Sequence, residues 1–108
     1  MMITFPVWGI EATGYTPIST FWQDFCIAER YGLQAVEETC RRAFRCWKSN
    51  VEYLTELALV LNWKIWQHYE EKRDDFATLY DRLWKECNAW CMDNLEGEDI
   101  AYYLDKTD

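Results

Sequence analysis

The chain has 108 residues, half of them hydrophobic, and 19 acidic against 11 basic residues give it a net charge of -8 at pH 7. A chain of this length builds one core, and only four Gly and two Pro argue against low-complexity and disordered classes. The acidic balance repels DNA, RNA and anionic membranes, so it disfavours these partners and favours proteins, metal ions or small cations.

The sequence carries no pattern for membrane insertion or export. Its longest apolar run, Leu57 to Leu61, is far shorter than the roughly 20 residues of a membrane span. The N-terminal residues have neither the positive start nor the cleavable apolar stretch of a signal peptide. Five cysteines, an odd number, are typical of reduced thiols. We therefore expect a cytoplasmic protein with no membrane partner.

Residues 1–18 contain both prolines and two of the four glycines. This composition predicts an extended N-terminal arm, in which residues 2–8 could form a short strand. The apolar residues of the arm indicate that it packs on the rest of the chain. Residues 19–108 are predicted to form a single helical-bundle domain.

Two helices are predicted in the first half of the chain. The first begins after Ser19 or Thr20 and ends before Gly32, because glycine suits the left-handed residue that closes a helix. The second covers roughly Gln34 to Trp47. Their apolar stripes are Phe21, Phe25 and Ala28 in the first helix, and Val36, Cys40, Ala43, Phe44 and Trp47 in the second.

The third predicted helix, Asn50 to Lys72, opens with Ser49 and Glu52 at capping-box spacing. It is apolar nearly all round from Leu57 to Trp66, which is typical of a helix at the centre of a bundle or inside an oligomer. Asn62 lies inside this stretch. We predict a buried amide there that fixes helix register or oligomer state, unless this side of the helix meets water.

A fourth helix is predicted from Asp74 or Asp75 to about Leu95, and Gly97 is predicted to end it. A short final helix follows, with three apolar residues turned back toward the bundle: Ile100, Tyr103 and Leu104. The sequence therefore predicts an all-α fold, a bundle of about four helices plus a short C-terminal helix, with the extended N-terminal arm.

The segment "IAERYGLQAVEETCRRAFRCWKSN" has the helix–glycine–helix pattern of a DNA-reading helix-turn-helix. Ala28 and Gly32 have the required spacing, but the residues that should anchor the second helix fall at Glu38 and Arg41. The acidic balance of the remaining chain also repels a duplex. We therefore predict an αα-hairpin whose basic patch docks a protein or pairs with acids. The patch consists of Arg41, Arg42, Arg45 and Lys48.

The spacing of cysteine and histidine predicts no metal site and no other cofactor. Cys87 and Cys91 share a helix face, yet a tetrahedral site needs two more ligands, and the sequence has neither a Cys-x-x-Cys pair nor paired histidines. Small core thiols account for the same spacing. His68, the one histidine, is expected at the surface or paired with the negative end of its helix.

Four carboxylates support an alternative enzyme class. All-α nucleotide pyrophosphatases hold magnesium with Glu-x-x-Glu and Glu-x-x-Asp pairs, and Glu71 and Asp74 match the second pair. Glu52 and Glu56 are four residues apart rather than three, which still places them on one helix face. If the four converge, they have the chemistry of a Mg²⁺ site. A magnesium-dependent hydrolase is therefore the alternative to a non-enzymatic role.

Aromatic residues make up 18% of the chain, including seven Trp and seven Tyr, which is more than a core of this size buries completely. Rings that reach the surface favour interfaces. Trp22, Trp63 and Trp84 are the candidates, because each lies beside the main stripe of its helix. The tail from Asp93 to Asp108 is acidic, and a second alternative is a nucleic-acid mimic or inhibitor.

Four segments, "TFWQDFCIAERYG", "KSNVEYLTELALVLNWKIW", "LYDRLW" and "YYLDKTD", resemble short bacterial proteins of unknown function found among mobile-element genes. The resemblance rests on helix-core spacing and covers most of the chain from Thr20 onward. It implies no activity and no site, and it favours a small accessory or interaction protein. We therefore expect a module that binds another protein or a second copy of itself, rather than an enzyme.

Overall fold

The computed structural model describes residues 17–107, with side chains from Thr20 onward, and these residues form five α-helices. Their bounds are α1 Pro17–Glu29, α2 Leu33–Trp47, α3 Val51–Glu70, α4 Asp74–Asn94 and α5 Gly97–Thr107. The predicted all-α fold is confirmed. The predicted strand at residues 2–8 and the predicted arm up to residue 16 lie outside the described residues. Residues 17 and 18 were predicted to end the arm, but they belong to α1, which begins at Pro17 and not after Ser19 or Thr20.

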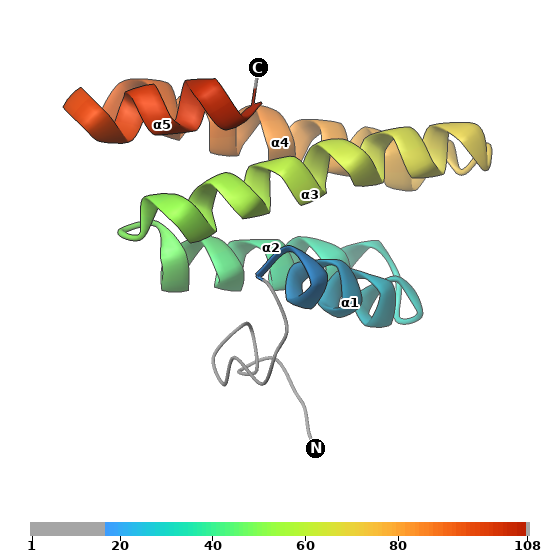
Figure 1. Cartoon of the computed structure of the whole chain (residues 1–108). Helices are drawn as coiled ribbons and strands as arrows, with labels where there is room; N and C mark the ends of the chain where they lie inside the picture. The colour runs from blue at the N-terminus through green and yellow to red at the C-terminus, as the bar shows by residue number, and fades with distance from the viewer. Residues whose placement is uncertain (1–16, 108) are drawn as a thin grey trace.

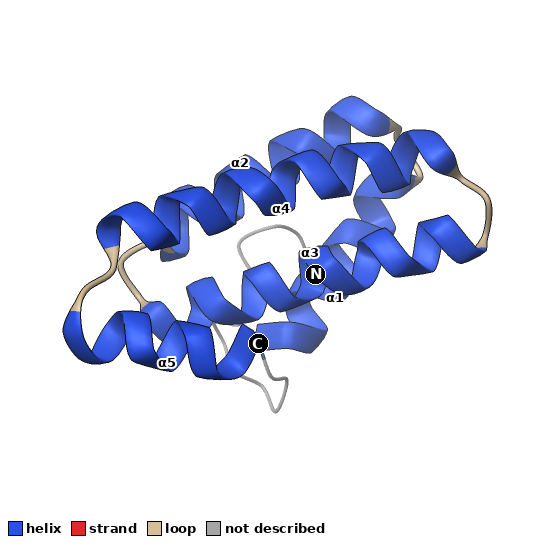
Figure 2. Cartoon of the chain, turned by 90° about the horizontal axis from the view of Figure 1, so that it is seen from above, coloured by secondary structure: helices blue, strands red, loops and turns tan. Residues whose placement is uncertain are grey.

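Helix α3 is the centre of the bundle, because it packs against each of the other four helices. Figure 1 shows α1 and α2 on one side of α3, and α4 and α5 on the other. Seen from above in Figure 2, α2, α3 and α4 run along the same long direction. The central position predicted from the apolar character of this helix is therefore confirmed.

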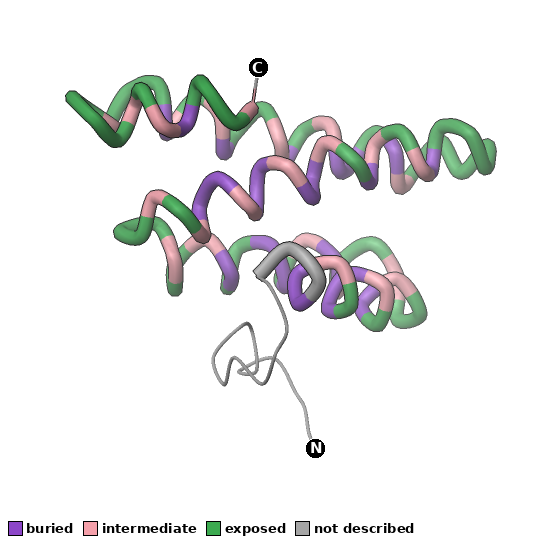
Figure 3. Tube along the Cα trace, viewed as in Figure 1, coloured by how far each residue is buried: buried purple, intermediate pink, exposed green. Residues whose placement is uncertain are grey.

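The hydrophobic core is built from the faces that the helices turn toward one another, as the purple segments in Figure 3 show. The predicted stripe of α1 is buried at Phe21, Phe25 and Ala28, and Leu83 of α4 is buried in the same core cluster. Each fully buried Phe or Leu side chain stabilises the fold by roughly 1.5–3 kcal/mol. On α5, Tyr103 is buried as predicted.

Two predicted core positions are wrong or only partly right. Leu104 is exposed, because the buried face of α5 is narrow and centres on Tyr103. Asn62 is partly exposed rather than buried. The outer side of α3 at this residue is open enough for the amide to meet water, as the alternative interpretation of the sequence had it.

The turns depend on two glycines with positive φ. Gly32 has a φ of 114° and separates α1 from α2, in a backbone region that side chains rarely allow. Gly97 has a φ of 57° and is the first residue of α5. It was predicted to end the preceding helix, but α4 already ends at Asn94, with Leu95 as its C-cap.

The helix starts differ from the predicted caps. Asn50, not Ser49, is the N-cap of α3, and its side-chain oxygen accepts a hydrogen bond of 3.1 Å from the backbone N–H of Tyr53. The predicted capping box of Ser49 and Glu52 is therefore wrong. At the start of α4 the N-cap is Arg73, so neither of the two predicted aspartates occupies that position. They lie in the first turn, where negative charge favours the helix dipole.

Replacing the observed cap tests this assignment. We expect Asn50→Ala to lower the free energy of unfolding by about 1 kcal/mol, because one backbone N–H of the first turn loses its acceptor. Ser49→Ala, at the position that the sequence pattern favoured, should change stability by less than about half that amount. Urea denaturation followed by circular dichroism measures both. A larger loss for Ser49→Ala than for Asn50→Ala would contradict the structure.

Candidate functional site

A buried charged cluster joins three helices around the carboxylate of Glu29 on α1. Its Oε2 lies 3.1 Å from Nζ of Lys64, 2.8 Å from Nε2 of His68 and 2.6 Å from the hydroxyl of Tyr80. Lys64 and His68 are on α3, and Tyr80 is on α4. The side chains of Lys64, His68 and Tyr80 are fully buried. This cluster ties α1, α3 and α4 together at one point.

Further contacts surround the Lys64 ammonium. Nζ donates to Oε1 of Gln67 at 3.0 Å and to Sγ of Cys26 at 3.3 Å. It also lies 4.1 Å from the centre of the Trp22 ring, a cation–π distance. With Glu29, these contacts satisfy the ammonium although it has no access to water.

The imidazole of His68 stacks against two rings of α4. Its centre lies 5.1 Å from the ring centre of Phe76 and 5.4 Å from that of Tyr80. Its Nδ1 is buried and has no hydrogen-bond partner among the described residues. The prediction of a surface histidine is wrong, because the helix face that carries His68 points into the bundle.

The environment of Glu29 favours its charged form. Burial acts to raise the pKa of the carboxyl, but hydrogen bonds from Tyr80 and His68 and the charge of Lys64 outweigh it and hold the pKa below its usual value. Burial, and then the hydrogen bond to Glu29, raise the pKa of the Tyr80 hydroxyl, so the hydroxyl stays protonated and donates. The arrangement holds charges in place and positions helices.

Sequence reasoning missed the two members of this cluster on α3, Lys64 and His68, although a signal was present. Leu54, Leu57 and Leu61 are spaced by three and then four residues, and Lys64 and His68 continue that alternation. Residues at these spacings share one helix face. All five side chains are fully buried in the structure. The spacing of the leucines therefore predicts that Lys64 and His68 lie in the core.

A pocket of about 310 Å³ lies between α2 and α4. The apolar part of its wall includes Phe44 and Trp90, whose ring centres are 5.3 Å apart at an interplanar angle of 86°. The thiols of Cys40 and Cys87 also line it, and burial raises the pKa of Cys40 to about 12. The other lining residues are Arg41, Arg45, Leu83 and Glu86.

The pair of cysteines that the sequence singled out is a buried contact within α4. Both Cys87 and Cys91 are buried, and a hydrogen bond to Cys91, together with burial, raises the pKa of the Cys87 thiol. In residues 17–107 no group of three or more His, Cys, Asp or Glu side chains is placed to hold a metal ion. Both thiols lie in the core, as expected for small core residues at this spacing.

Arg41 of the predicted basic patch belongs to an ion-pair network that joins α2 to α4. It contacts Glu37 at 2.9 Å and Glu86 at 3.2 Å, and Arg82 contacts the same two carboxylates at 3.2 and 3.4 Å. All four side chains are partly exposed to water, so these ion pairs contribute little to the stability of the fold. The network therefore fixes the geometry of the pocket rim more than it stabilises the fold.

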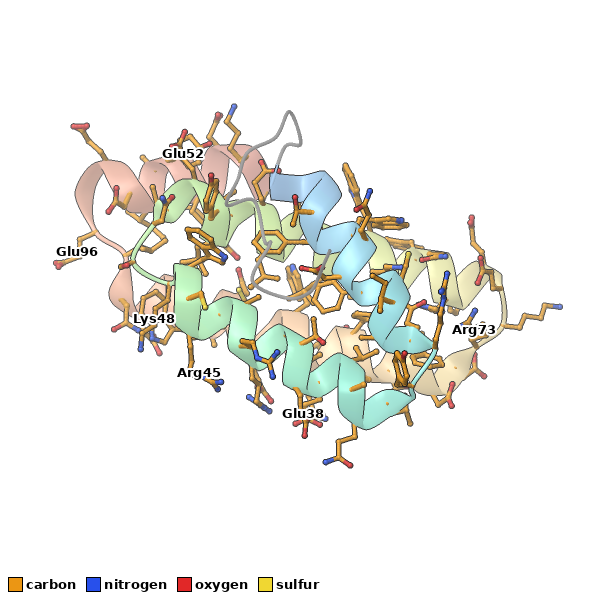
Figure 4. All side chains as sticks on the ribbon, turned by 90° about the horizontal axis from the view of Figure 1, so that it is seen from below. Glu38, Arg45, Lys48, Glu52, Arg73 and Glu96 are labelled. Carbon is orange, nitrogen blue, oxygen red and sulfur yellow. The ribbon has the colours of Figure 1, made fainter. Side chains whose placement is uncertain are left out.

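The other three residues of the basic patch, Arg42, Arg45 and Lys48, are exposed. Figure 4 shows Arg45 and Lys48 projecting outward from α2. Neither Arg45 nor Lys48 forms an ion pair or hydrogen bond with a described residue through its side chain. Arg45 lines the pocket and Lys48 does not.

The three predicted interface tryptophans have different environments. Trp22 and Trp84 are partly buried against the core, whereas Trp63 is 49% exposed. Two rings beside Trp63 on α3 are more exposed still: Trp66 at 59% and Tyr69 at 64%. Their ring centres are 6.1 Å apart. The sequence analysis counted Trp66 in the stretch of α3 that is apolar nearly all round. We call Trp63, Trp66 and Tyr69 the α3 aromatic face.

The four carboxylates of the alternative magnesium site do not converge. Glu52 and Glu56 lie in the first turns of α3, and Glu71 and Asp74 lie beyond its other end. Some 18 residues of helix correspond to roughly 27 Å. Figure 4 shows Glu52 at the opposite end of the bundle from Arg73, the neighbour of Asp74. The predicted shared site at these residues is therefore wrong, because one cation cannot touch both pairs.

Asp24 of α1 is a second buried carboxylate. Its Oδ2 is buried and accepts no hydrogen bond from any residue in the described part of the chain, and burial raises the pKa of the carboxyl to about 7. No sequence signal marked this residue, because an aspartate on a short helix is expected at the surface.

The chain matches no protein-family model, no curated protein and no solved structure. The resemblance to bacterial mobile-element proteins stays a prediction. Among the described helices, none combines the length and apolar composition needed to cross a bilayer.

Breaking the buried cluster should destabilise the fold strongly. Lys64→Met and Glu29→Gln should each lower the unfolding free energy by about 3–5 kcal/mol, since each leaves a buried partner uncompensated. The double variant should lose less than the sum of the two, because both remove the same interaction. Urea denaturation at pH 7 measures this cycle, with the exposed Glu96→Gln as the control. Strictly additive losses would contradict the contact.

The same carboxylate predicts a pH dependence. The folded-state pKa of Glu29 is held below its usual value of 4.5, so its contribution is complete above about pH 4.5 and is lost as the pH falls through the folded-state pKa. The stability of the wild-type protein should therefore fall over this acidic range more than that of Glu29→Gln.

Asp24 predicts the opposite dependence. Its folded-state pKa is about 7 against a usual value of 3.8, so the folded state is favoured at low pH and loses stability as the pH rises through this range. Asp24→Asn should be more stable than the wild type by about 1–3 kcal/mol at pH 8, and the gain should shrink toward pH 4. The exposed Asp105→Asn is the control. A gain that does not depend on pH would contradict the assignment.

Proposed function

We propose that the protein is a small interaction module that binds another protein through the α3 aromatic face. The observation that carries the proposal is the exposure of three large rings, Trp63, Trp66 and Tyr69, on consecutive turns of one helix. Contiguous exposed aromatic surface is uncommon on monomeric proteins, and it favours binding sites. Trp and Tyr are also the side chains that most often dominate binding energy.

The position of α5 leaves this face open. Helix α5 packs against α3, and Figure 1 shows it beside the N-terminal half of α3 only. Burial raises the pKa of Glu56 in that half, and the charge of Lys106 from α5 opposes the rise, which places the end of α5 near Glu56. The aromatic face lies further along α3, on the part that α5 does not reach.

The charge around the aromatic face indicates the partner's chemistry. Glu70, one turn after Trp66, is exposed, and Glu71 follows it at the end of the helix. The whole chain carries a net charge of -8. A second copy would bring like charges together, whereas a partner with an apolar patch rimmed by Lys or Arg would complement both features. A different, basic-rimmed protein is therefore the proposed partner.

The proposal predicts that Trp66→Ala weakens binding without unfolding the module. The ring is largely exposed, so we expect the melting temperature to stay within a few degrees of the wild type. Affinity for the purified partner should fall roughly 10-fold or more, because central aromatic residues dominate interfaces. Tyr31→Ala removes an exposed ring outside the aromatic face and serves as the matched control.

The partner is first identified by comparing what the wild type and Trp66→Ala each retain from lysate, and is then purified. Titration of the two purified proteins at two salt concentrations gives the affinities. The proposal requires that salt weakens the complex. It is overturned if Trp66→Ala and Tyr31→Ala bind the partner equally well. It is also overturned if sedimentation shows a wild-type dimer that Trp66→Ala converts to monomer, since a second copy then occupies the face.

A further inference from the structure

We propose that the pocket between α2 and α4 binds a small aromatic monocarboxylate, with Arg45 holding the carboxylate and the rings of Phe44 and Trp90 holding the aromatic body. The pocket lies on α2 and α4 and shares no residue with the α3 aromatic face, so this inference is independent of the proposed protein partner.

The walls of the pocket fit an apolar body. Its volume of about 310 Å³ lies at the lower end of the range for small-molecule sites, roughly 300–1,000 Å³. Phe44 and Trp90 stand nearly perpendicular to each other, and such a pair presents a face and an edge to a third ring. The buried thiol of Cys40, whose pKa burial raises to about 12, is uncharged at neutral pH. A flat ring therefore meets neutral groups on these walls.

The rim supplies one positive charge that has no partner within the described part of the chain. Arg41 is already held by Glu37 and Glu86, whereas the guanidinium of Arg45 forms no ion pair with the described residues. Guanidinium groups bind carboxylates through paired hydrogen bonds. Arg45 is therefore the group available to an incoming carboxylate.

Glu86 sets the limit on the ligand's charge. It lines the same pocket, and its carboxylate is shared between Arg41 and Arg82. With Arg41, Arg45 and Glu86 on the rim, one positive charge remains for the ligand. A monoanion balances this charge, while a dianion such as a phosphate monoester would add repulsion from Glu86. This charge balance selects a monocarboxylate over a phosphate.

The test is an NMR titration of the full chain with 3-phenylpropionate, and 3-phenylpropionamide as its neutral analogue. We expect saturable shifts at the Trp90 indole and at residues 40–45 and 83–90, and clearly weaker binding of the amide. N-acetyl-Gly-Phe carries the same carboxylate on a peptide. The proposal requires that it binds no more tightly than 3-phenylpropionate.

Three charge variants give a pattern that a nonspecific effect does not reproduce. Arg45→Gln should weaken 3-phenylpropionate binding roughly 3- to 10-fold, because it removes the charged hydrogen-bond donor. Glu86→Gln should strengthen binding, because it removes the rim carboxylate that repels an anion and one of the two carboxylates that hold Arg41. Lys48→Gln, which removes one positive charge from the end of α2 outside the pocket, should change binding little. All three residues are exposed, so the fold is retained.

Several results would overturn the assignment. Equal weakening by Arg45→Gln and Lys48→Gln would show only general attraction to a basic surface. Equal binding of 3-phenylpropionate and its amide would also overturn the assignment. So would tighter binding of the peptide, or the absence of saturable shifts at millimolar concentrations. Trp66→Ala should bind 3-phenylpropionate like the wild type, so failure here is distinguishable from failure of the proposed interaction module.

Discussion

The carboxylate of Glu29 is the point on which the arrangement of the helices depends. Removing Glu29, Lys64 and His68 from water opposes folding, and their mutual contacts offset that cost only when all of them are in place. A shift of α1 along α3 would separate Glu29 from Lys64 in the interior, and a shift of α4 would break the hydrogen bond from Tyr80 to Glu29. Apolar packing tolerates such shifts far better than a buried ion pair does. The cluster thereby selects one register of the bundle from several that would bury similar apolar area.

Much of the fold could be predicted from the sequence, because each helix carries an apolar face of helical period. Gly32 also marks the turn between α1 and α2, where the backbone has a conformation that other residues rarely adopt. The site could not be predicted to the same degree. His68 was judged by its polarity rather than by its position on the leucine face, and Lys64 was not singled out. Trp66 was judged by its apolarity rather than by what covers it. The exposure of the α3 aromatic face depends on where α5 ends, and the pocket depends on how closely α2 approaches α4. Both are distances between elements remote in sequence, and no local pattern encodes them.

The buried charged cluster, the α3 aromatic face and the pocket lie in three different parts of the molecule. The charged cluster is sealed inside α1, α3 and α4, the aromatic face lies on the open part of α3, and the pocket lies between α2 and α4. Arg41 and Arg82 pair with Glu37 and Glu86, both within and between α2 and α4, and Arg45 is left as an available cation on an acidic protein. A docked protein would therefore act on α3, and a small anion on α2 and α4. Both α2 and α4 pack against α3, so the two surfaces are in contact through this helix.

The unbroken alternation of buried residues along α3 limits how this protein can evolve. Inserting or deleting one residue between Leu61 and Lys64 would rotate everything beyond it by about 100° and carry Lys64 and His68 out of the interior. The same change would move Trp66 and Tyr69 to a different side of the helix. Inserting or deleting seven residues would keep each side chain on its present side of the helix, but it would lengthen or shorten α3 by roughly 10 Å relative to α4. The length of α3 between Leu54 and His68 is therefore effectively locked, and related chains should vary in length at the turns instead.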